Sequence, residues 1–378
     1  MTSHKLALLT AAALASAGSL VACSSSDDST SSEATASQSA TEEETSSVEE
    51  EADPSSTDDA STADASESES SAPSVSVVST TTMLGSVVGD IVACASPDST
   101  AITLMPVGVD PHDFSPSSAQ VADLVTSDLV VANGLMLEEG LEDALENAES
   151  DGATVLEVAP LLDPIPYGDE HGDEHGDEHG DEHGDEHGDE HGDEHGDEHG
   201  HGSEDPHFWF DMNRMATAAE IIGADLAEDN GDVFAECGSK IADEIRSAEQ
   251  DVRALLESVP ADERILITDH DALGYLAEVY GYEVAGTVIP SGSTLAEPSS
   301  ADLVELVEVI EDEGVQVIFA NTADPTTLAE AVAAEAGNDV QVVTLFVGSL
   351  GGPDSGAEDY VSMMLTNAEL ISGALNAN

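Results

Sequence analysis

The sequence of 378 residues predicts an α/β protein with two (β/α) lobes, each built on a mostly parallel sheet, and a long connecting helix between them. Three observations support this fold class. Short β-branched runs alternate with helical segments between residues 75 and 158, and the same alternation returns after residue 262. The stretch between these two halves carries helical signals but no strand signal.

Residues 1–23 have the pattern of a lipoprotein signal peptide rather than of folded structure. Lys5 precedes an apolar stretch from Leu6 to Leu20, which is too short for a typical membrane span. The stretch ends in Leu-Val-Ala-Cys, a bacterial lipoprotein processing pattern that predicts a lipid anchor on Cys23. Ordinary cleavage that leaves Cys23 free is the alternative. Since no later segment is apolar enough to span a bilayer, we expect an extracytoplasmic protein anchored to the outer face of the cell membrane.

Residues 24–74 consist of Ser, Thr, Ala, Asp and Glu with almost no large apolar side chains. Such a segment cannot bury enough surface to offset its ordering entropy, so it is predicted to be a disordered acidic tether. Its random-coil reach is roughly 40 Å, which suits a spacer between a lipid and a folded domain.

The N-terminal lobe is predicted to span residues 75–211. A β-branched run from Val75 to Thr80 favours a buried first strand, and Asn133-Gly134 stops the third. The predicted strands are 75–80, 101–105, 129–132 and 154–158, and the predicted helices are 83–92, 117–126 and 141–148.

Connecting helices are predicted over residues 212–261, divided by Gly231, with one long helix from Val233 to Val259. The C-terminal lobe then spans residues 262–378, and Ser299-Ser300 is expected to cap one of its helices. The predicted strands are 265–268, 283–288, 315–319 and 340–346, and the predicted helices are 272–280, 301–312, 326–336 and 360–375.

An insert at residues 168–202 interrupts the first lobe with eight Gly-Asp-Glu-His repeats. A glycine at every fourth position disfavours a helix, so we expect a flexible loop. One interpretation is a low-affinity metal collector, and the other is a repeat-generated spacer. Its nine histidines, which are candidate accessory metal ligands, are His171, His175, His179, His183, His187, His191, His195, His199 and His201.

The formal net charge of -75 is distributed over the whole chain. The tether and the repeats hold 31 of the 81 acidic residues, so the predicted lobes are themselves strongly acidic. Binding to nucleic acid or to an anionic lipid surface is therefore not expected. Two cysteines remain after Cys23, and an exported protein meets oxidising conditions, so Cys94 and Cys237 are candidates for a disulfide.

Apart from His4 and the nine histidines of the insert, three of the thirteen histidines remain in the predicted lobes, at His112, His207 and His270. All three lie in turns beside or near aspartates, and two follow an Asp-Pro pair. Because open α/β sheets bind ligands beyond the carboxyl ends of their strands, we expect the three to meet between the lobes. Neutral imidazole is a good ligand of Zn²⁺, and three leave a fourth position open. The side chains expected to orient the rings are those of Asp110, Asp205, Asp269 and Asp271.

An enzyme is not expected. Three histidines and a bound water could in principle hydrolyse a substrate. However, the chain has no His-Glu-x-x-His helix, no Gly-x-Ser-x-Gly elbow and no Walker-type loop. An adhesin or a surface metal buffer stays open as an alternative.

Five stretches together resemble the zinc/manganese-type (cluster A-I) solute-binding lipoproteins of bacterial ABC metal importers, most closely the zinc-binding members. The matching motifs stand in family order and span about residues 75–378. They are MPVGVDPHDF (105–114), NG followed by LE (133–138), DPHFWFD (205–211), TDHDALGY (268–275) and GSLG (348–351).

The resemblance implies a rigid connecting helix, a metal site between the lobes, and His112, His207 and His270 as its ligands. It implies capture of Zn²⁺ and delivery to an ABC permease in the membrane, with manganese or another divalent metal as the alternative cargo. Gly348 stands where many relatives place an Asp ligand, and Asn321 where they often place Glu. The fourth ligand is then water, a histidine of the insert or a nearby carboxylate. We expect the protein to act as a monomer.

Overall fold

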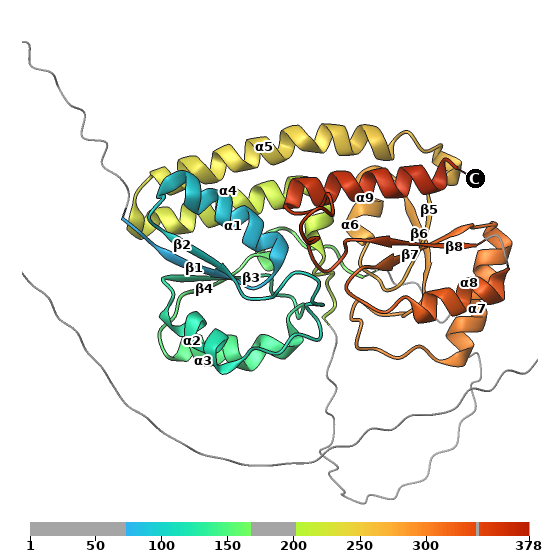
Figure 1. Cartoon of the computed structure of the whole chain (residues 1–378), viewed down its shortest axis with the longest axis horizontal. Helices are drawn as coiled ribbons and strands as arrows, with labels where there is room; N and C mark the ends of the chain where they lie inside the picture. The colour runs from blue at the N-terminus through green and yellow to red at the C-terminus, as the bar shows by residue number, and fades with distance from the viewer. Residues whose placement is uncertain (1–72, 168–201, 338–339, 378) are drawn as a thin grey trace, which may run out of the picture. The chain divides into compact units, whose positions relative to one another are not determined.

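The computed structural model describes residues 73–167, 202–337 and 340–377 (Figure 1). The predicted signal peptide with Cys23, the tether and all nine histidines of the insert lie outside the described residues. The described residues belong to one compact unit.

The first lobe is a four-stranded parallel sheet with the strand order β2-β1-β3-β4. Val78 of the central strand lies beside Ile102 on one side and Val130 on the other. The elements are β1 (Ser76–Ser79), α1 (Thr82–Ala95), β2 (Thr100–Thr103), α2 (Ser118–Thr126), β3 (Leu129–Ala132), η1 (Glu139–Leu141), α3 (Glu142–Ser150), β4 (Val155–Glu157) and η2 (Ala159–Leu161).

The second lobe repeats this arrangement with the order β6-β5-β7-β8, and its strands are also all parallel. Its elements are η4 (Ala261–Glu263), β5 (Ile265–Thr268), α6 (Gly274–Tyr280), β6 (Glu283–Thr287), α7 (Ser300–Glu313), β7 (Val317–Asn321), α8 (Thr327–Ala336), β8 (Gln341–Leu345) and α9 (Tyr360–Leu375). Between the lobes lie η3 (Phe208–Phe210), α4 (Met212–Asn230) and α5 (Val233–Leu256).

Successive residues of the central strands face opposite layers of helices. Val78 packs in a cluster with residues of α2 and α3, whereas Val77 faces a second cluster that includes α1, α4 and α5. This second cluster continues through α9 and onto one face of the C-terminal sheet, including Leu266 and Phe319. One continuous apolar core therefore joins both lobes along α4, α5 and α9 (Figure 1), while α7 and α8 cover the remaining face.

The connection between the lobes is a helical hairpin rather than a lone helix. Gly231, with a φ of 103°, ends α4, and α5 runs back along it. The two helices touch at Gly223 and Gly238, where a Cβ on Gly223 would lie 2.8 Å from the Cα of Gly238. Because glycine has no side chain, the two backbones can come into direct contact at this point, so α5 packs closely against α4.

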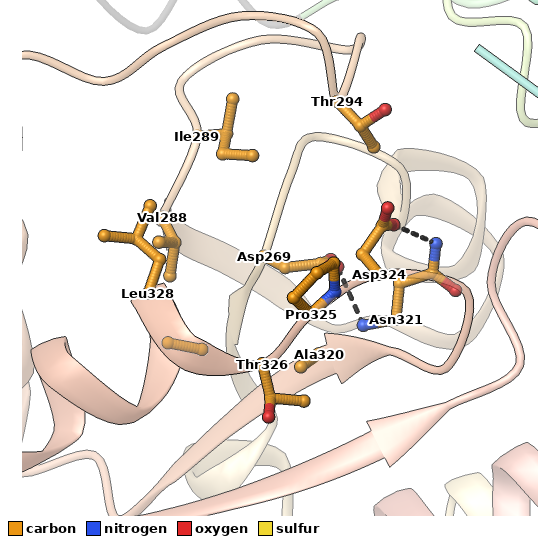
Figure 2. Close-up of a pocket in the computed structure, with 11 residues that line it drawn as sticks. Asp269, Val288, Ile289, Thr294, Ala320, Asn321, Asp324, Pro325, Thr326 and Leu328 are labelled. Atoms are coloured by element: carbon orange, nitrogen blue, oxygen red, sulfur yellow. Dashed lines mark hydrogen bonds between the residues drawn. The ribbon is translucent and has the colours of Figure 1, made fainter. Parts of the chain in front are cut away.

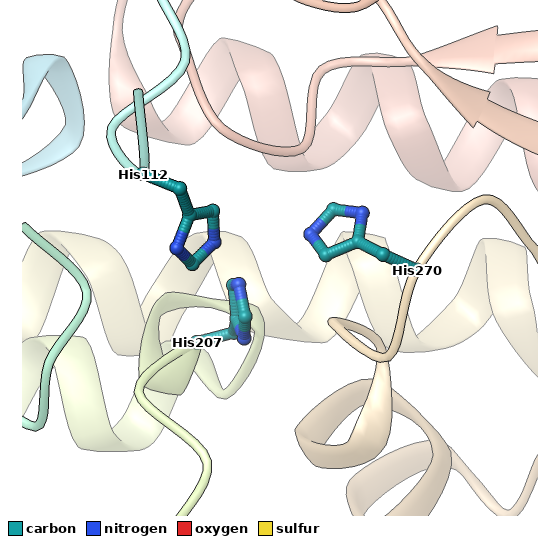
Figure 3. A group of neighbouring side chains, drawn as sticks. All are labelled: His112, His207 and His270. Carbon is teal, nitrogen blue, oxygen red and sulfur yellow. The ribbon is translucent and has the colours of Figure 1, made fainter. Parts of the chain in front are cut away.

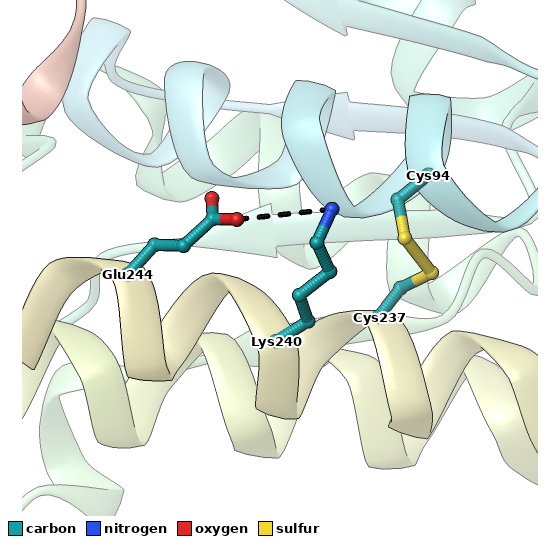
Figure 4. Close-up of a disulfide and its surroundings, with 4 residues drawn as sticks. All are labelled: Cys94, Cys237, Lys240 and Glu244. Carbon is teal, nitrogen blue, oxygen red and sulfur yellow. Dashed lines mark ion pairs between the residues drawn. A yellow bond between two sulfur atoms is a disulfide. The ribbon is translucent and has the colours of Figure 1, made fainter.

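A disulfide joins Cys94 of α1 to Cys237 of α5 (Figure 4), with the Cα atoms 5.9 Å apart. One turn farther along α5, Lys240 pairs with Glu244 at 3.7 Å. The cross-link closes a sequence separation of 143 residues and ties the first lobe covalently to the connecting hairpin.

The element order agrees with the sequence prediction, but several boundaries were predicted wrongly. Helix α1 ends at Ala95 rather than at residue 92, and α5 ends at Leu256 rather than Val259. The second strand ends at Thr103 rather than Met105, and α6 begins at Gly274 rather than Ala272. The strand predicted at 315–319 is β7 at 317–321, because Val315 completes the end of α7. Gly314 adopts the left-handed conformation there, and the amide of Val315 donates to the carbonyl of Ile310.

The glycine contact between α4 and α5 predicts opposite effects for two Gly→Ala changes. Alanine favours a helix by about 0.5–1 kcal/mol over glycine. At Gly238, however, the new Cβ would lie 2.6 Å from the carbonyl oxygen of Ala219, so Gly238→Ala should lower the free energy of unfolding by about 1–3 kcal/mol. A Cβ at Gly373 of α9 would meet no atom within 4 Å, so Gly373→Ala should raise the free energy of unfolding through the helix preference of alanine alone. Urea unfolding of both variants measures the difference, and equal stability would contradict close contact at Gly238.

Candidate metal centre

His112, His207 and His270 are brought together by loops of both lobes (Figure 3). All three side chains are buried, and their ring centroids lie 5.4–5.9 Å apart. One nitrogen of each ring lies within 4.8 Å of the corresponding nitrogens of the other two. A tetrahedral Zn²⁺ with bonds of about 2.1 Å needs nitrogens about 3.4 Å apart, so the rings need to approach by no more than about 1.5 Å.

His207 lies between the lobes and its loop is held from both sides. From the N-terminal lobe, the side-chain amide of Asn133 donates to the carbonyl of Pro206 at 3.0 Å. From the C-terminal lobe, the hydroxyl of Tyr275 donates to the carbonyl of Asp205 at 2.9 Å. The carboxylate of Asp205 accepts from the backbone amide of His207 and also lies 2.8 Å from its Nδ1. The Nε2 of His207 is therefore the nitrogen left to face the other two rings.

His270 follows β5 directly, at the point where the C-terminal strand order reverses between β5 and β7. Its neighbour Asp269 accepts from the backbone amide of His270 and lies 3.0 Å from its Nδ1. The second oxygen of Asp269 accepts from the backbone amide of Asn321, the last residue of β7, at 2.7 Å. The hydroxyl of Thr268 also donates to the carbonyl of His270. The ring is thus fixed by both central strands.

His112 lies farther from its strand, in the loop between β2 and α2. Its backbone amide donates to Asp110 at 3.1 Å. The carboxylate of Glu139 lies near its ring, with 3.9 Å between Nδ1 and Oε1. The four aspartates expected to orient the rings therefore differ. Asp205 and Asp269 contact rings, and the carboxylate of Asp110 accepts from the backbone amide of His112. The backbone amide of Asp271 donates to the carbonyl of Ser291.

The electrostatic surroundings set the protonation of the rings. Burial, together with the charge of His270, lowers the pKa of His207 well below its ordinary value, which keeps this ring neutral. Burial also lowers the pKa of His270, but the charge and hydrogen bond of Asp269 outweigh it and raise the pKa overall. Burial raises the pKa of Asp205 to about 7.

The donor set fits a divalent cation. The Nε2 of His207 is buried and has no hydrogen-bond partner among residues 73–167, 202–337 and 340–377. A buried imidazole nitrogen without a partner is costly in the empty protein, and a bound metal ion would satisfy it. Carboxylates on the Nδ1 of His207 and His270 favour the tautomers that present Nε2 to an ion.

A pocket of about 150 Å³ lies in the C-terminal lobe (Figure 2), and one of its lining residues is Asp269, whose carboxylate contacts the ring of His270. Asp269 and Asp324 line it, and Asn321 links them by donating its backbone amide to one and its side-chain amide to the other. Burial, followed by the charge of Asp110, raises the pKa of Asp324 to about 6. Negative charge thus accumulates next to His270.

Gly348 stands where the family resemblance led us to expect an acidic ligand, and the structure leaves little room for a side chain there. A Cβ there would lie 2.9 Å from the ring of Pro111 and 3.4 Å from the side-chain amide of Asn321. Within the described part of the chain, the candidate ligand group contains the three histidines and no carboxylate.

Comparison with known proteins places the chain among metal-uptake proteins. Residues 77–374 match the family described as zinc-uptake complex component A, periplasmic. Zinc-binding protein TroA of Treponema pallidum is 27% identical over 307 residues, which cover 79% of this chain and 88% of TroA. Manganese-binding lipoprotein MntA of Halalkalibacterium halodurans is 22% identical over 295 residues, which cover 77% and 86%. The solved structure of TroA superposes with a TM-score of 0.63 at 26% identity and covers 80% of this chain and 99% of that chain.

Two parallel-sheet lobes on a shared helical core, with a buried cluster of ligand-type side chains between them, define a two-lobed solute-binding protein. The chain belongs to the zinc-uptake complex component A family. Proteins of this family are metal-binding components of ABC-type uptake systems and are not enzymes. The predicted family and fold class are confirmed. Among the described helices, none combines the length and the apolar character that crossing a membrane requires.

The different surroundings of the rings predict a pH titration that can be followed without metal. As the pH falls, His270 should take up a proton at a higher pH than His207, because only His270 has its pKa raised. Asp269→Asn should lower the pKa of His270, since it removes the charge that raises it. Nitrogen-15 NMR of the imidazole rings measures both titrations. A lower pKa for His270 than for His207 in the unchanged protein would contradict this electrostatic description.

Proposed function

We propose that this protein captures Zn²⁺ outside the cytoplasm and delivers it to an ABC permease, with His112, His207 and His270 as the protein ligands. The observation that carries the proposal is the meeting of three buried imidazoles from both lobes, two of them oriented by aspartates. Buried neutral imidazole suits Zn²⁺, and three such ligands leave a fourth position for water or an exchanging group.

A lipid on Cys23 would keep the captured ion close to the membrane that holds the permease. The relatives named manganese-binding lipoprotein MntA are consistent with such an anchor. A tether of about fifty residues would let the lobes reach a neighbouring permease while the lipid stays in the membrane.

Manganese is the second candidate cargo, because two of the relatives are named manganese-binding. Mn²⁺ prefers carboxylate, carbonyl and water ligands and binds nitrogen sites more weakly than Zn²⁺ does. The candidate ligand group among the described residues consists of imidazoles alone, which favours zinc.

Each of the three histidines should be needed for tight binding. His112→Ala, His207→Ala and His270→Ala should each weaken zinc affinity by about a hundredfold or more, since one of few ligands is lost. Competition against a chromophoric chelator measures the affinity, and circular dichroism checks that each variant is folded. A variant that binds zinc as tightly as the unchanged protein would remove that histidine from the proposed site.

Competitive titration should also place zinc above manganese, with and without residues 168–202. Deletion of the insert should leave one tight site per molecule and remove only weaker binding, because the three imidazoles lie outside it. Isothermal titration of both forms measures the stoichiometry. Loss of the tight site on deletion would show that a histidine of the insert completes the coordination, and manganese outcompeting zinc would overturn the proposed cargo.

A further inference from the structure

The loop between β6 and α7 contacts the surroundings of two of the three histidines. Its first residues are bound to the segment that carries His270. The amide of Ile289 donates to the carbonyl of Asp269 at 2.7 Å, and the amide of Asp271 donates to the carbonyl of Ser291 at 2.9 Å. The loop therefore moves with the His270 segment.

Two residues later the same loop crosses to the N-terminal lobe. The hydroxyl of Ser293 donates to the carboxylate of Glu139 at 2.6 Å, and the hydroxyl of Thr294 donates to the carboxylate of Asp110. Ser293 is buried, and its oxygen also accepts from the amide of Leu295, so its hydroxyl proton is directed toward Glu139.

Both acceptors on the N-terminal lobe contact His112. Asp110 accepts from the backbone amide of His112, and Glu139 lies 3.9 Å from the Nδ1 of its ring. The other two rings have their carboxylates at 2.8 and 3.0 Å, from residues one or two positions away in sequence. His112 differs because its ring carboxylate belongs to another segment and is held by the opposite lobe.

Close packing over the loop depends on Gly292. A Cβ at this position would lie 1.8 Å from the hydroxyl oxygen of Tyr167, which belongs to the N-terminal lobe. The absence of a side chain lets the loop fit beneath Tyr167 and brings Ser293 and Thr294 within reach of their acceptors.

We propose that Ser293 and Thr294 form a cross-lobe clasp that positions His112 through Glu139 and Asp110 and slows release of the bound ion. The inference rests on the proposed function, since it gives these two hydroxyls a role at the same site. When an ion binds the far nitrogen of His112, the ring proton on Nδ1 becomes more positive and is attracted to Glu139. Because Glu139 is held by Ser293, an occupied His112 strengthens the contact between the lobes.

The test uses Ser293→Ala and Thr294→Val, alone and together, in the full-length protein. The matched control is Thr366→Val in α9, which removes an exposed hydroxyl bonded to the carbonyl of Gly356 at 2.6 Å. Zinc dissociation is followed by stopped-flow transfer to a chelator. We expect the double variant to release zinc about tenfold faster, each single variant about threefold faster, and the control at the unchanged rate.

A double-mutant cycle distinguishes the clasp from general loosening of the protein. In a Glu139→Gln background, Ser293→Ala should add little further acceleration, because the two residues act through one hydrogen bond. In the metal-free protein, the nitrogen-15 chemical shifts of the His112 ring should change in the double variant. Those of the His207 ring should stay the same.

Additive effects of Ser293→Ala and Glu139→Gln, or unchanged zinc release and an unchanged His112 ring in the double variant, would overturn the clasp. If the unchanged protein does not bind zinc tightly, the proposed cargo fails instead, and the metal-free spectra still test the positioning of His112.

Discussion

The structure depends on one constraint: the apolar core that runs without interruption from one sheet to the other along α4, α5 and α9. Because the backbones of α4 and α5 are in contact at Gly223 and Gly238, we expect the two helices to behave as one rigid unit. The disulfide from Cys94 to Cys237 attaches the first lobe to it. The lobes therefore cannot separate widely without exposing core residues, and loops of both lobes stay within a few ångströms of one another. This limits any closure around a cation to small adjustments of loops.

The two lobes solve the same local problem in parallel ways. In each sheet the order reverses between its first and third strands, and a carboxylate bonds to residues at the ends of both. In the first lobe Glu138 accepts from the hydroxyl of Thr80 and the amide of Asn133. In the second lobe Asp269 follows β5 and accepts from Asn321 at the end of β7. Only the second carboxylate is placed beside a histidine, whereas Glu138 anchors the turn that presents Glu139. The position of the switch point explains why ligand-type residues gather where they do.

The sequence predicts the fold well because most of its signals are local. Buried β-branched runs such as 129–132 and 265–268 coincide with β3 and β5 to the residue, and the closing helix matches α9. The grouping of His112, His207 and His270 was predictable from their positions in turns and from the motif resemblance. The contacts of Asp205 and Asp269 with two of these rings were predictable because each aspartate is close to its histidine in sequence. The roles of Glu139, Ser293 and Thr294 were not predictable, since they join residues 154 and 184 positions apart and no local pattern marks such pairs. Likewise, the sequence alone marks Gly223 and Gly238 only as residues that destabilise a helix. Their role in the contact between α4 and α5 appears only in the structure.

The charge around the histidine cluster and the type of its ligands affect different steps of cation binding. The five cations of the described residues are all engaged away from the cluster, with Arg214, Arg253 and Arg264 stacked on tyrosine rings and Lys240 and Arg246 paired with glutamates. The carboxylates near the histidine cluster include Asp110, Glu139, Asp269 and Asp324, so the electrostatic field there is negative and attracts any cation. Attraction of this kind increases the rate of encounter but does not distinguish one divalent ion from another. If the three imidazoles are the ligands, as proposed above, discrimination between divalent ions would depend on the ligand type and on how firmly the protein holds the geometry of the rings.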